Sequence, residues 1–255
     1  MNNTAARVIT TVLCLVTIAA ILVGLYIHVF SRKFSFKKTA MTSGQSDYDE
    51  AVEEIKIDVD AANISIEEGD KFSVEYNLPE NAEPVVEFKN GVYSFKSKMS
   101  MHLAPFDIGN DMKVEVTVPE GTDLKSILLE LDAGNVSLEG LKTDKIRIES
   151  KAGNIEMDEM KTDTLEIESN AGNITISDLK TDKAKLEIDA GNIELKDSEI
   201  DNIEASTDAG NVTVNDSTVN SGMCRTDFGN VELTGKIGEG VRAKTSVGNA
   251  TINGR

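Results

Sequence analysis

The pattern of hydrophobic and polar residues changes sharply along the chain. Residues 8–30 contain no Lys, Arg, Asp or Glu and are apolar almost throughout. From residue 52 onward, apolar and polar residues alternate in short runs that Gly, Asn, Asp and Pro separate. This alternation is typical of strands with one buried face, and no part of the region shows the 3.6-residue period of an amphipathic helix. The pattern therefore predicts an N-terminal transmembrane helix followed by an all-β body.

A Gly-Asn pair recurs at a fixed interval in the second half of the body. The pairs stand 19 residues apart, at 134–135, 153–154, 172–173, 191–192, 210–211, 229–230 and 248–249. Apolar residues keep the same step, as in the columns that begin at Val136, Leu138, Ile146 and Ile148. A short period sustained in this way is the signature of a solenoid. Because 19 residues are too few for a helical crossover, equivalent strands are expected to stack as parallel sheets.

These features predict an all-β fold, namely a parallel β-solenoid of 19-residue coils preceded by an irregular antiparallel β region and one N-terminal transmembrane helix. The expected boundaries are an N-terminal flank at 1–7, the transmembrane helix at 8–30, a basic collar and flexible linker at 31–51, an N-terminal β region that caps the solenoid at 52–123, and about seven repeats at 124–255. Residues 61–66 look like a degenerate repeat outside the register. Asn90-Gly91, between two apolar runs, predicts a β-hairpin.

The repeated Gly-Asn pair has a structural explanation. Gly adopts positive φ angles at turns at little cost. Asn side chains at one corner of successive coils can donate hydrogen bonds to one another and accept them. We expect a ladder that satisfies buried polar groups of the turn, although a ligand-binding row is the alternative reading. Its members would be Asn135, Asn154, Asn173, Asn192, Asn211, Asn230 and Asn249.

The charge of the chain is unevenly distributed. Residues 1–40 contain five basic residues and no acidic one, whereas residues 41–255 contain 21 basic and 44 acidic residues. A body this acidic would be repelled by phosphate backbones, so nucleic acid is not an expected partner. The bases that follow residue 30 favour a cytoplasmic body by the positive-inside rule, but long domains are exported largely regardless of charge. Charge alone leaves both orientations open.

One row of acidic residues is a candidate cation site. Asp189, Asp208 and Asp227 each stand two residues before a Gly, so they would stack at one strand spacing. Like charges this close are unfavourable, and a bound cation such as Ca²⁺ could relieve them. The simpler alternative is a solvated acidic edge. No other metal site and no cofactor is indicated.

Little in the sequence favours catalysis. The chain has two Cys, two His and no Trp, and the constant spacing leaves no insertion from which to build a water-excluding site. Cys224 falls in an apolar column, and the loop that contains His102 is expected to cover the end of the solenoid or to form a contact patch. No capping helix follows the last strand, Ala250–Ile252, so this coil is either blunted by its charges and glycines or pairs with another chain.

The chain resembles a bacterial family of β-strand-repeat proteins of unknown function that is labelled "putative adhesin". The resemblance covers about residues 52–255. It rests on Ile55-Lys-Ile-Asp-Val with Ala62-Asn-Ile-Ser-Ile, on the strand 114–119 and on the Gly-Asn coils that follow. It implies a β-solenoid that is often membrane-anchored or exported and is sometimes linked to envelope-stress regulation. No catalytic motif comes with it, and it favours a body outside the cell membrane.

The sequence therefore predicts a non-enzymatic, membrane-anchored binding or scaffold protein of the cell envelope, whose partner is an envelope component or another protein. One alternative is a cytoplasmic, membrane-tethered polymer that self-associates through the C-terminal coil. Another is a calcium-binding solenoid module that uses the Asp row.

Overall fold

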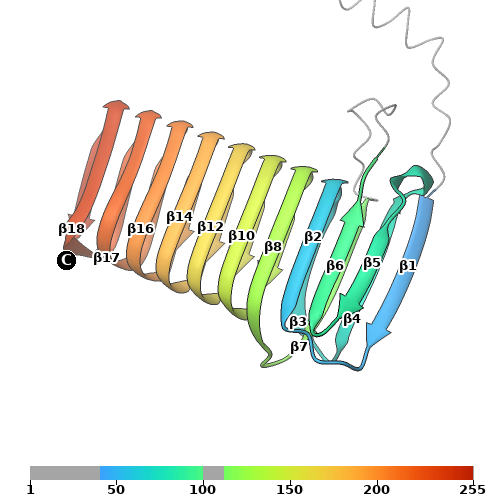
Figure 1. Ribbon diagram of the computed structural model, residues 1–255. Coiled ribbons are helices and arrows are strands. Elements are labelled where there is room, and N and C mark those ends of the chain that lie inside the picture. The colour runs from blue at the N-terminus through green and yellow to red at the C-terminus, as the bar shows by residue number, and fades with distance from the viewer. Residues whose placement is uncertain (1–40, 100–111, 255) are drawn as a thin grey trace, which may run out of the picture. The chain divides into compact units, whose positions relative to one another are not determined.

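The computed structural model describes residues 41–99 and 112–254, which form a single 19-stranded sheet wound into a parallel β-solenoid (Figure 1). In this part of the chain, helix is limited to one 3-10 turn, Glu80–Ala82. The all-β solenoid expected from the repeat is thus confirmed. The expected membrane helix at 8–30 lies outside the described residues. Within them, no helix has the length and apolar character needed to cross a membrane.

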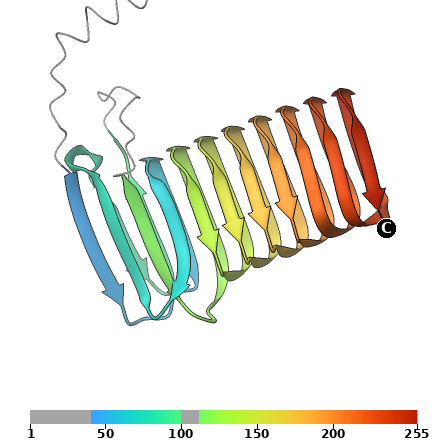
Figure 2. The same ribbon diagram turned by 180° about the vertical axis from the view of Figure 1, so that it is seen from behind.

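Each regular coil consists of one long and one short strand, which lie on two faces of the solenoid (Figure 2). The long strands are β8 (Asp123–Ala133), β10 (Lys142–Ala152), β12 (Lys161–Ala171), β14 (Lys180–Ala190) and β16 (Glu199–Ala209). The short strands are β9 (Val136–Glu139), β11 (Ile155–Asp158), β13 (Ile174–Ser177) and β15 (Ile193–Lys196). In the last coils the short and long strands merge into β17 (Val212–Phe228) and β18 (Val231–Val247), and β19 (Ala250–Gly254) follows.

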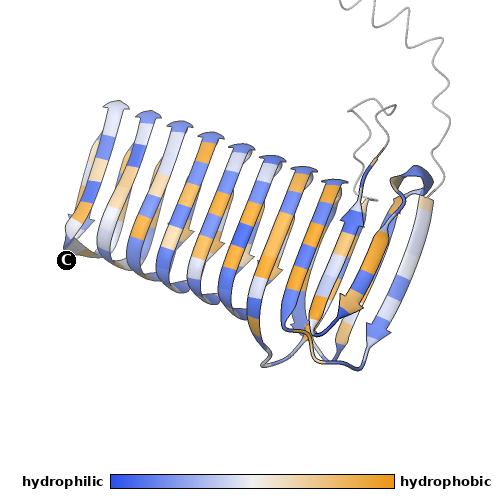
Figure 3. Cartoon of the chain, viewed as in Figure 1, coloured by the Kyte–Doolittle hydropathy of each residue, from blue (hydrophilic) through white to orange (hydrophobic). Residues whose placement is uncertain are grey.

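The core is a set of apolar columns that run through successive coils. Ile146 pairs with Leu165, and Ile148 pairs with Ile167, in the 19-residue register that the repeat predicts. All four side chains are fully buried. Figure 3 shows apolar and polar positions alternating along many of the long strands. Burying an Ile or Leu contributes roughly 1.5–3 kcal/mol, so these columns are the main stabilising element of the coil.

The solenoid begins earlier in the chain than the repeat indicated. β2 (Glu54–Ala61) pairs in parallel with β8, and β3 (Asn63–Gly69) pairs in parallel with β9. These two strands are therefore a complete coil that stacks on the first Gly-Asn coil. The predicted boundary at residue 124 is wrong, because residues 70–122 interrupt the repeat in sequence but not in space.

The interrupting segment builds a cap on the outer side of this first coil. It contains β4 (Phe72–Pro79), β5 (Val85–Lys89), β6 (Val92–Ser97) and β7 (Lys113–Pro119). β6 and β7 continue the parallel stacking on β2 and β3, whereas β4 and β5 run antiparallel to β7 and β6. The cap is thus mixed, not purely antiparallel as expected. The predicted hairpin at Asn90-Gly91 is confirmed, with φ angles of 53° and 75°.

Part of the predicted linker is also structured. Residues Met41–Tyr48 form β1, which pairs antiparallel with β4 along its whole length. The segment is polar, so its sequence carries no strand pattern, and backbone pairing holds it in place. Tyr48 anchors its end, because the Tyr48 ring lies 5.4 Å from the Phe72 ring and 4.8 Å from the Phe88 ring.

The pairing of β17 with β18 is irregular, although the Gly-Asn spacing stays constant there. Val214 pairs with Leu233, 19 residues on, but Ser217 pairs with Gly235, only 18 residues on. The 19-residue step returns at Ser221 and Gly240. One residue is therefore lost at the turn and regained before the long strand, so the expectation of unbroken spacing fails in this coil.

Candidate functional site

The Gly-Asn corner is the most regular feature of the surface. At Gly172, φ is +134°, and a Cβ atom would lie 1.9 Å from the carbonyl oxygen of Gly153. Gly is therefore required because neighbouring coils touch backbone to backbone at this corner. This close stacking places the Asn that follows each Gly beside the Asn of the next coil.

The seven predicted Asn residues do form one row, which Asn63 extends by one rung. The backbone N–H of each Asn donates to the side-chain Oδ1 of the Asn in the preceding coil, at N···O distances of 2.8–3.0 Å. The seven Asn residues are exposed, whereas the ladder was expected to satisfy buried polar groups of the turn. The row therefore satisfies turn N–H groups at a solvent-facing corner. Asn63 was missed as a rung because the inserted cap separates it from the repeat.

The Asp row lies beside this corner. Asp189, Asp208 and Asp227 are exposed, and the Ser246 hydroxyl donates to Asp227 at 3.4 Å. Earlier in the same column, Lys151 forms an ion pair with Asp132 at 2.6 Å. Within residues 41–99 and 112–254, no three His, Cys, Asp or Glu side chains come together in a way that could hold a metal ion.

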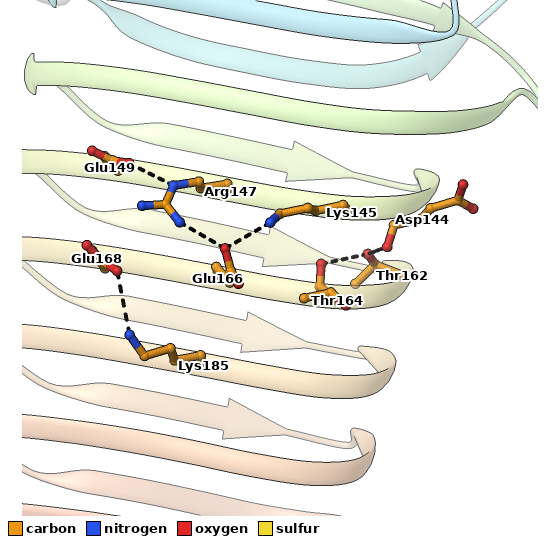
Figure 4. A network of polar contacts seen from close by, with 9 residues as sticks. All are labelled: Asp144, Lys145, Arg147, Glu149, Thr162, Thr164, Glu166, Glu168 and Lys185. Carbon is orange, nitrogen blue, oxygen red and sulfur yellow. Dashed lines mark hydrogen bonds and ion pairs between the residues drawn. The ribbon is translucent and has the colours of Figure 1, made fainter.

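The outward face of the long strands carries a network of opposite charges (Figure 4). Glu166 accepts from Lys145 at 3.1 Å and from Arg147 at 3.0 Å, and Arg147 also binds Glu149 at 2.7 Å. The hydrogen bond from Lys145 lowers the pKa of Glu166; partial burial opposes this shift and Arg147 reinforces it. One coil further on, Lys185 lies between Glu168 and Glu187, at 3.6 and 3.0 Å. The result is a polar surface that spans β10, β12 and β14.

A shallow depression of about 370 Å³ lies at the turn that leads into the long strands. Lys180 and Glu199 form an ion pair of 2.7 Å at its rim, and Asn220 donates to Asp201 at 2.6 Å. The full lining is Lys180, Thr181, Asp182, Glu199, Ile200, Asp201, Thr218, Asn220 and Lys236. The column 142, 161 and 180 is Lys in each coil and then changes to Glu199, which is the sequence signal that could have marked this place.

The thiol in this part of the chain is enclosed. Cys224 is fully buried, and burial alone raises its pKa to about 12. A protonated thiol without access to solvent is a poor nucleophile. Cys224 is therefore a core residue, as the column predicted. His28 and His102 both lie outside the described residues.

The coil geometry agrees with a comparison to known protein families. The model of the Toastrack DUF4097 family matches residues 52–254, from just before the first coil to β19. The chain belongs to this family. The resemblance drawn from the Gly-Asn coils and the first strands is thereby shown. No relative was found among curated proteins.

Two solved structures are similar to this Toastrack chain in fold. One is a "putative adhesin" from Bacteroides fragilis, with a TM-score of 0.62 and 22% identity, covering 84% of this chain and 98% of the other. Another is a "putative lipid binding protein" from Parabacteroides distasonis, with a TM-score of 0.51 and 18% identity, covering 86% of this chain and 96% of the other. At these identities the likeness concerns the fold alone.

Proposed function

We propose that the protein is a non-enzymatic binding or scaffold protein of the cell envelope, anchored by residues 8–30 with its solenoid body outside the membrane. The observation that carries this proposal is the long-strand face, where polar side chains of successive coils form rows in a constant 19-residue register. A surface of this kind suits an extended partner, such as another protein or an envelope polymer. The names of the two similar structures, both for binding proteins, support the same class.

The surface offers little that would support catalysis instead. Glu166 is the centre of an ion-pair network, and the hydrogen bond from Lys145 keeps its pKa low, which suits a permanently charged contact and not a general acid. The link to envelope-stress regulation rests on the family resemblance and stays a prediction.

The experiment that tests the proposal is a topology assay on intact cells. Lys161 is exposed on a long strand, so a Lys161→Cys variant in a Cys224→Ala background presents one reactive thiol on the body. Labelling of intact cells by a membrane-impermeant thiol reagent is expected. Protection in intact cells followed by labelling after lysis would contradict an external body. Cys14 lies in the expected membrane segment, so a variant without Lys161→Cys serves as the control.

A cytoplasmic, membrane-tethered polymer is the second candidate, and one observation favours it. In the described part of the chain, no strand pairs with the outer edge of β19, where Ile252 is 42% exposed. Open strand edges are templates for pairing with another chain. Sedimentation that finds a strict monomer over a wide concentration range would remove this candidate.

A further inference from the structure

Exposed apolar side chains gather in the last two coils. Phe228 is 63% exposed, Val247 59% and Met223 42%. Phe228 and Val247 are register neighbours in the column that directly precedes the repeated Gly. Five earlier coils have Ala at this position: Ala133, Ala152, Ala171, Ala190 and Ala209. Since the coil closes equally well with Ala, the larger side chains are not needed for the core.

Three cations and one acid, Asp227, lie beside these apolar residues, and Asp227 is exposed between Arg225 and Phe228. Arg242 is the register neighbour of Met223, and Lys244 is the register neighbour of Arg225. All three cations are exposed, and none forms an ion pair with a carboxylate of the described residues. Arg242 donates only to the backbone oxygens of Glu239 and Val241, at 2.8 and 3.2 Å. We call Met223, Arg225, Phe228, Arg242, Lys244 and Val247 the tip patch.

The tip patch departs from the charge of the rest of the body. Residues 41–211 contain 16 basic and 40 acidic residues, whereas residues 212–254 contain four of each. In the column that holds Arg225 and Lys244, earlier coils have Glu149, Glu168 and Glu187, followed by Ser206. The acidic column thus ends one coil earlier, and its basic residues appear in the same two coils in which Phe228 and Val247 replace Ala.

We propose that the tip patch docks on the surface of an anionic phospholipid bilayer. Cations alone would suit any polyanion. A surface that combines bases with protruding Phe, Val and Met side chains selects a partner with negative charge above an apolar layer, which describes an anionic bilayer. This inference goes beyond the proposed function and does not depend on the expected anchor, because it uses only residues 212–254.

A second copy of the chain is a poorer match for the tip patch. The acidic flanks would attract the three cations, but the other large exposed apolar residues of the described chain outside the last two coils are Met41 and Val85, in the cap. Contact between two tip patches would bury the apolar residues but oppose the cations of both copies. Each arrangement accommodates either the cations or the apolar residues, whereas an anionic bilayer accommodates both.

The test is vesicle flotation of the full chain reconstituted in phosphatidylcholine nanodiscs. We expect recovery with vesicles that contain about one third phosphatidylglycerol, and roughly tenfold less with pure phosphatidylcholine vesicles. High salt should weaken the recovery because it screens the cations. Absence of flotation with the anionic vesicles would overturn the proposal. If the chain elutes apart from the nanodiscs, the anchor is wrong, and the flotation assay still tests the tip patch.

Variants taken from the chain's own columns separate docking from folding. Phe228→Ala with Val247→Ala restores the Ala column, and Lys244→Glu introduces the residue that the same column has at 149, 168 and 187, so both changes are compatible with the coil. Each is expected to lower recovery about tenfold, as loss of one of two cooperating anchoring signals does. The matched controls are Val85→Ala and Lys161→Glu, which change exposed residues of the same kinds elsewhere. Equal loss in the controls would contradict a localised site.

A single fluorescent reporter distinguishes the partners. The chain contains no Trp, so Phe228→Trp places one indole in the patch. A blue shift of its emission that requires anionic vesicles supports insertion into the bilayer. Flotation without a shift would mean that another surface binds, which overturns the assignment. A shift that depends on protein concentration without lipid, together with dimers in sedimentation, would assign the patch to a second copy instead.

Discussion

The two ends of the described solenoid are built in opposite ways. At the N-terminal end, Phe72 and Tyr93 are fully enclosed by neighbouring rings, and the edge strand β1 is polar. At the C-terminal end, Phe228 stands in solvent, and no described strand pairs with the outer edge of β19. The solenoid is thus covered at one end by an inserted segment and has exposed apolar residues at the other. The aromatic residues at the first end serve folding, whereas Phe228 at the second end is available for contact.

The largest effect is expected where a substitution separates two coils. Gly172→Ala would place Cβ 1.9 Å from the Gly153 carbonyl oxygen in the middle of the stack. Because the backbones must move apart, we expect a loss of more than about 4 kcal/mol in the free energy of unfolding, measured by urea denaturation. Gly248→Ala meets Gly229 in the same way but in the last coil, so it should only fray that end.

Gly121→Ala is the control for backbone strain without a clash. Gly121 has φ +73°, but nothing lies within 4 Å of its added Cβ. Its cost should stay near 1 kcal/mol, the usual penalty for a positive φ. Equal losses for Gly121→Ala and Gly172→Ala would mean that close stacking is not what selects Gly at the corner.

The second prediction compares two Phe residues at the two ends. Phe72→Ala removes a buried ring from the aromatic cluster of the cap and should lower stability by about 3–5 kcal/mol. Phe228→Ala restores the residue of five other coils and should change stability by no more than about 0.5 kcal/mol. Thermal unfolding of both variants measures the difference. A large loss for Phe228→Ala would place that ring in the folding core and remove the contrast between the ends.

The third prediction concerns the Asn row. Asn173 Oδ1 accepts from the backbone N–H of Asn192 at 3.0 Å, so Asn173→Ala leaves that N–H without its partner. We expect a loss of about 1 kcal/mol. Asn249 is the last rung and accepts no such bond from a described residue, so Asn249→Ala should cost less. Equal costs for the two variants, measured by chemical denaturation, would argue against stabilisation by the hydrogen bonds between neighbouring Asn residues.

The smallest effect is expected from the charge network. The pKa of Glu166 is lowered from the usual 4.5, chiefly by the hydrogen bond from Lys145. Its contribution to stability is therefore present above pH 4.5 and is lost as the pH falls toward its folded-state pKa. Glu166→Gln should lower stability by about 0.2–1 kcal/mol at pH 7, and the difference from the unchanged chain should vanish in strong acid. A difference that persists unchanged at low pH would assign the effect to packing instead of charge.

The regular part of the fold could be predicted from the sequence because each coil repeats the same contacts at the same positions. Ile148 and Ile167 occupy the same place in successive coils, so a column in the sequence is a column in space. The first coil could not be placed this way, because its partners are separated from it by residues 70–122. β1 escaped prediction for another reason, since an edge strand held by backbone hydrogen bonds needs no apolar alternation.

The candidate sites could be predicted only in part. The sequence located the Asn row, because one residue type recurs at one position. It overlooked the tip patch, although Phe228 and Val247 break the Ala column and Arg225 is the first base in a column that begins with acidic residues. A departure from a repeat points to function only when exposure is known. The structure supplies that knowledge, because it distinguishes the exposed Phe228 from the buried Cys224 four residues before it.

The ladder of Gly-Asn corners also bears on how such a protein can change its length. Each middle coil pairs with the coil before it and the coil after it in the same register. One 19-residue unit can therefore be duplicated or lost without altering the cap or the last coil. Each event would move the two ends apart or together by about 4.8 Å, one strand spacing. A variant lacking residues 155–173 should therefore fold, and small-angle scattering should find its body shorter by that step. Duplication or loss of repeats can thus change the length of the solenoid in steps of one coil.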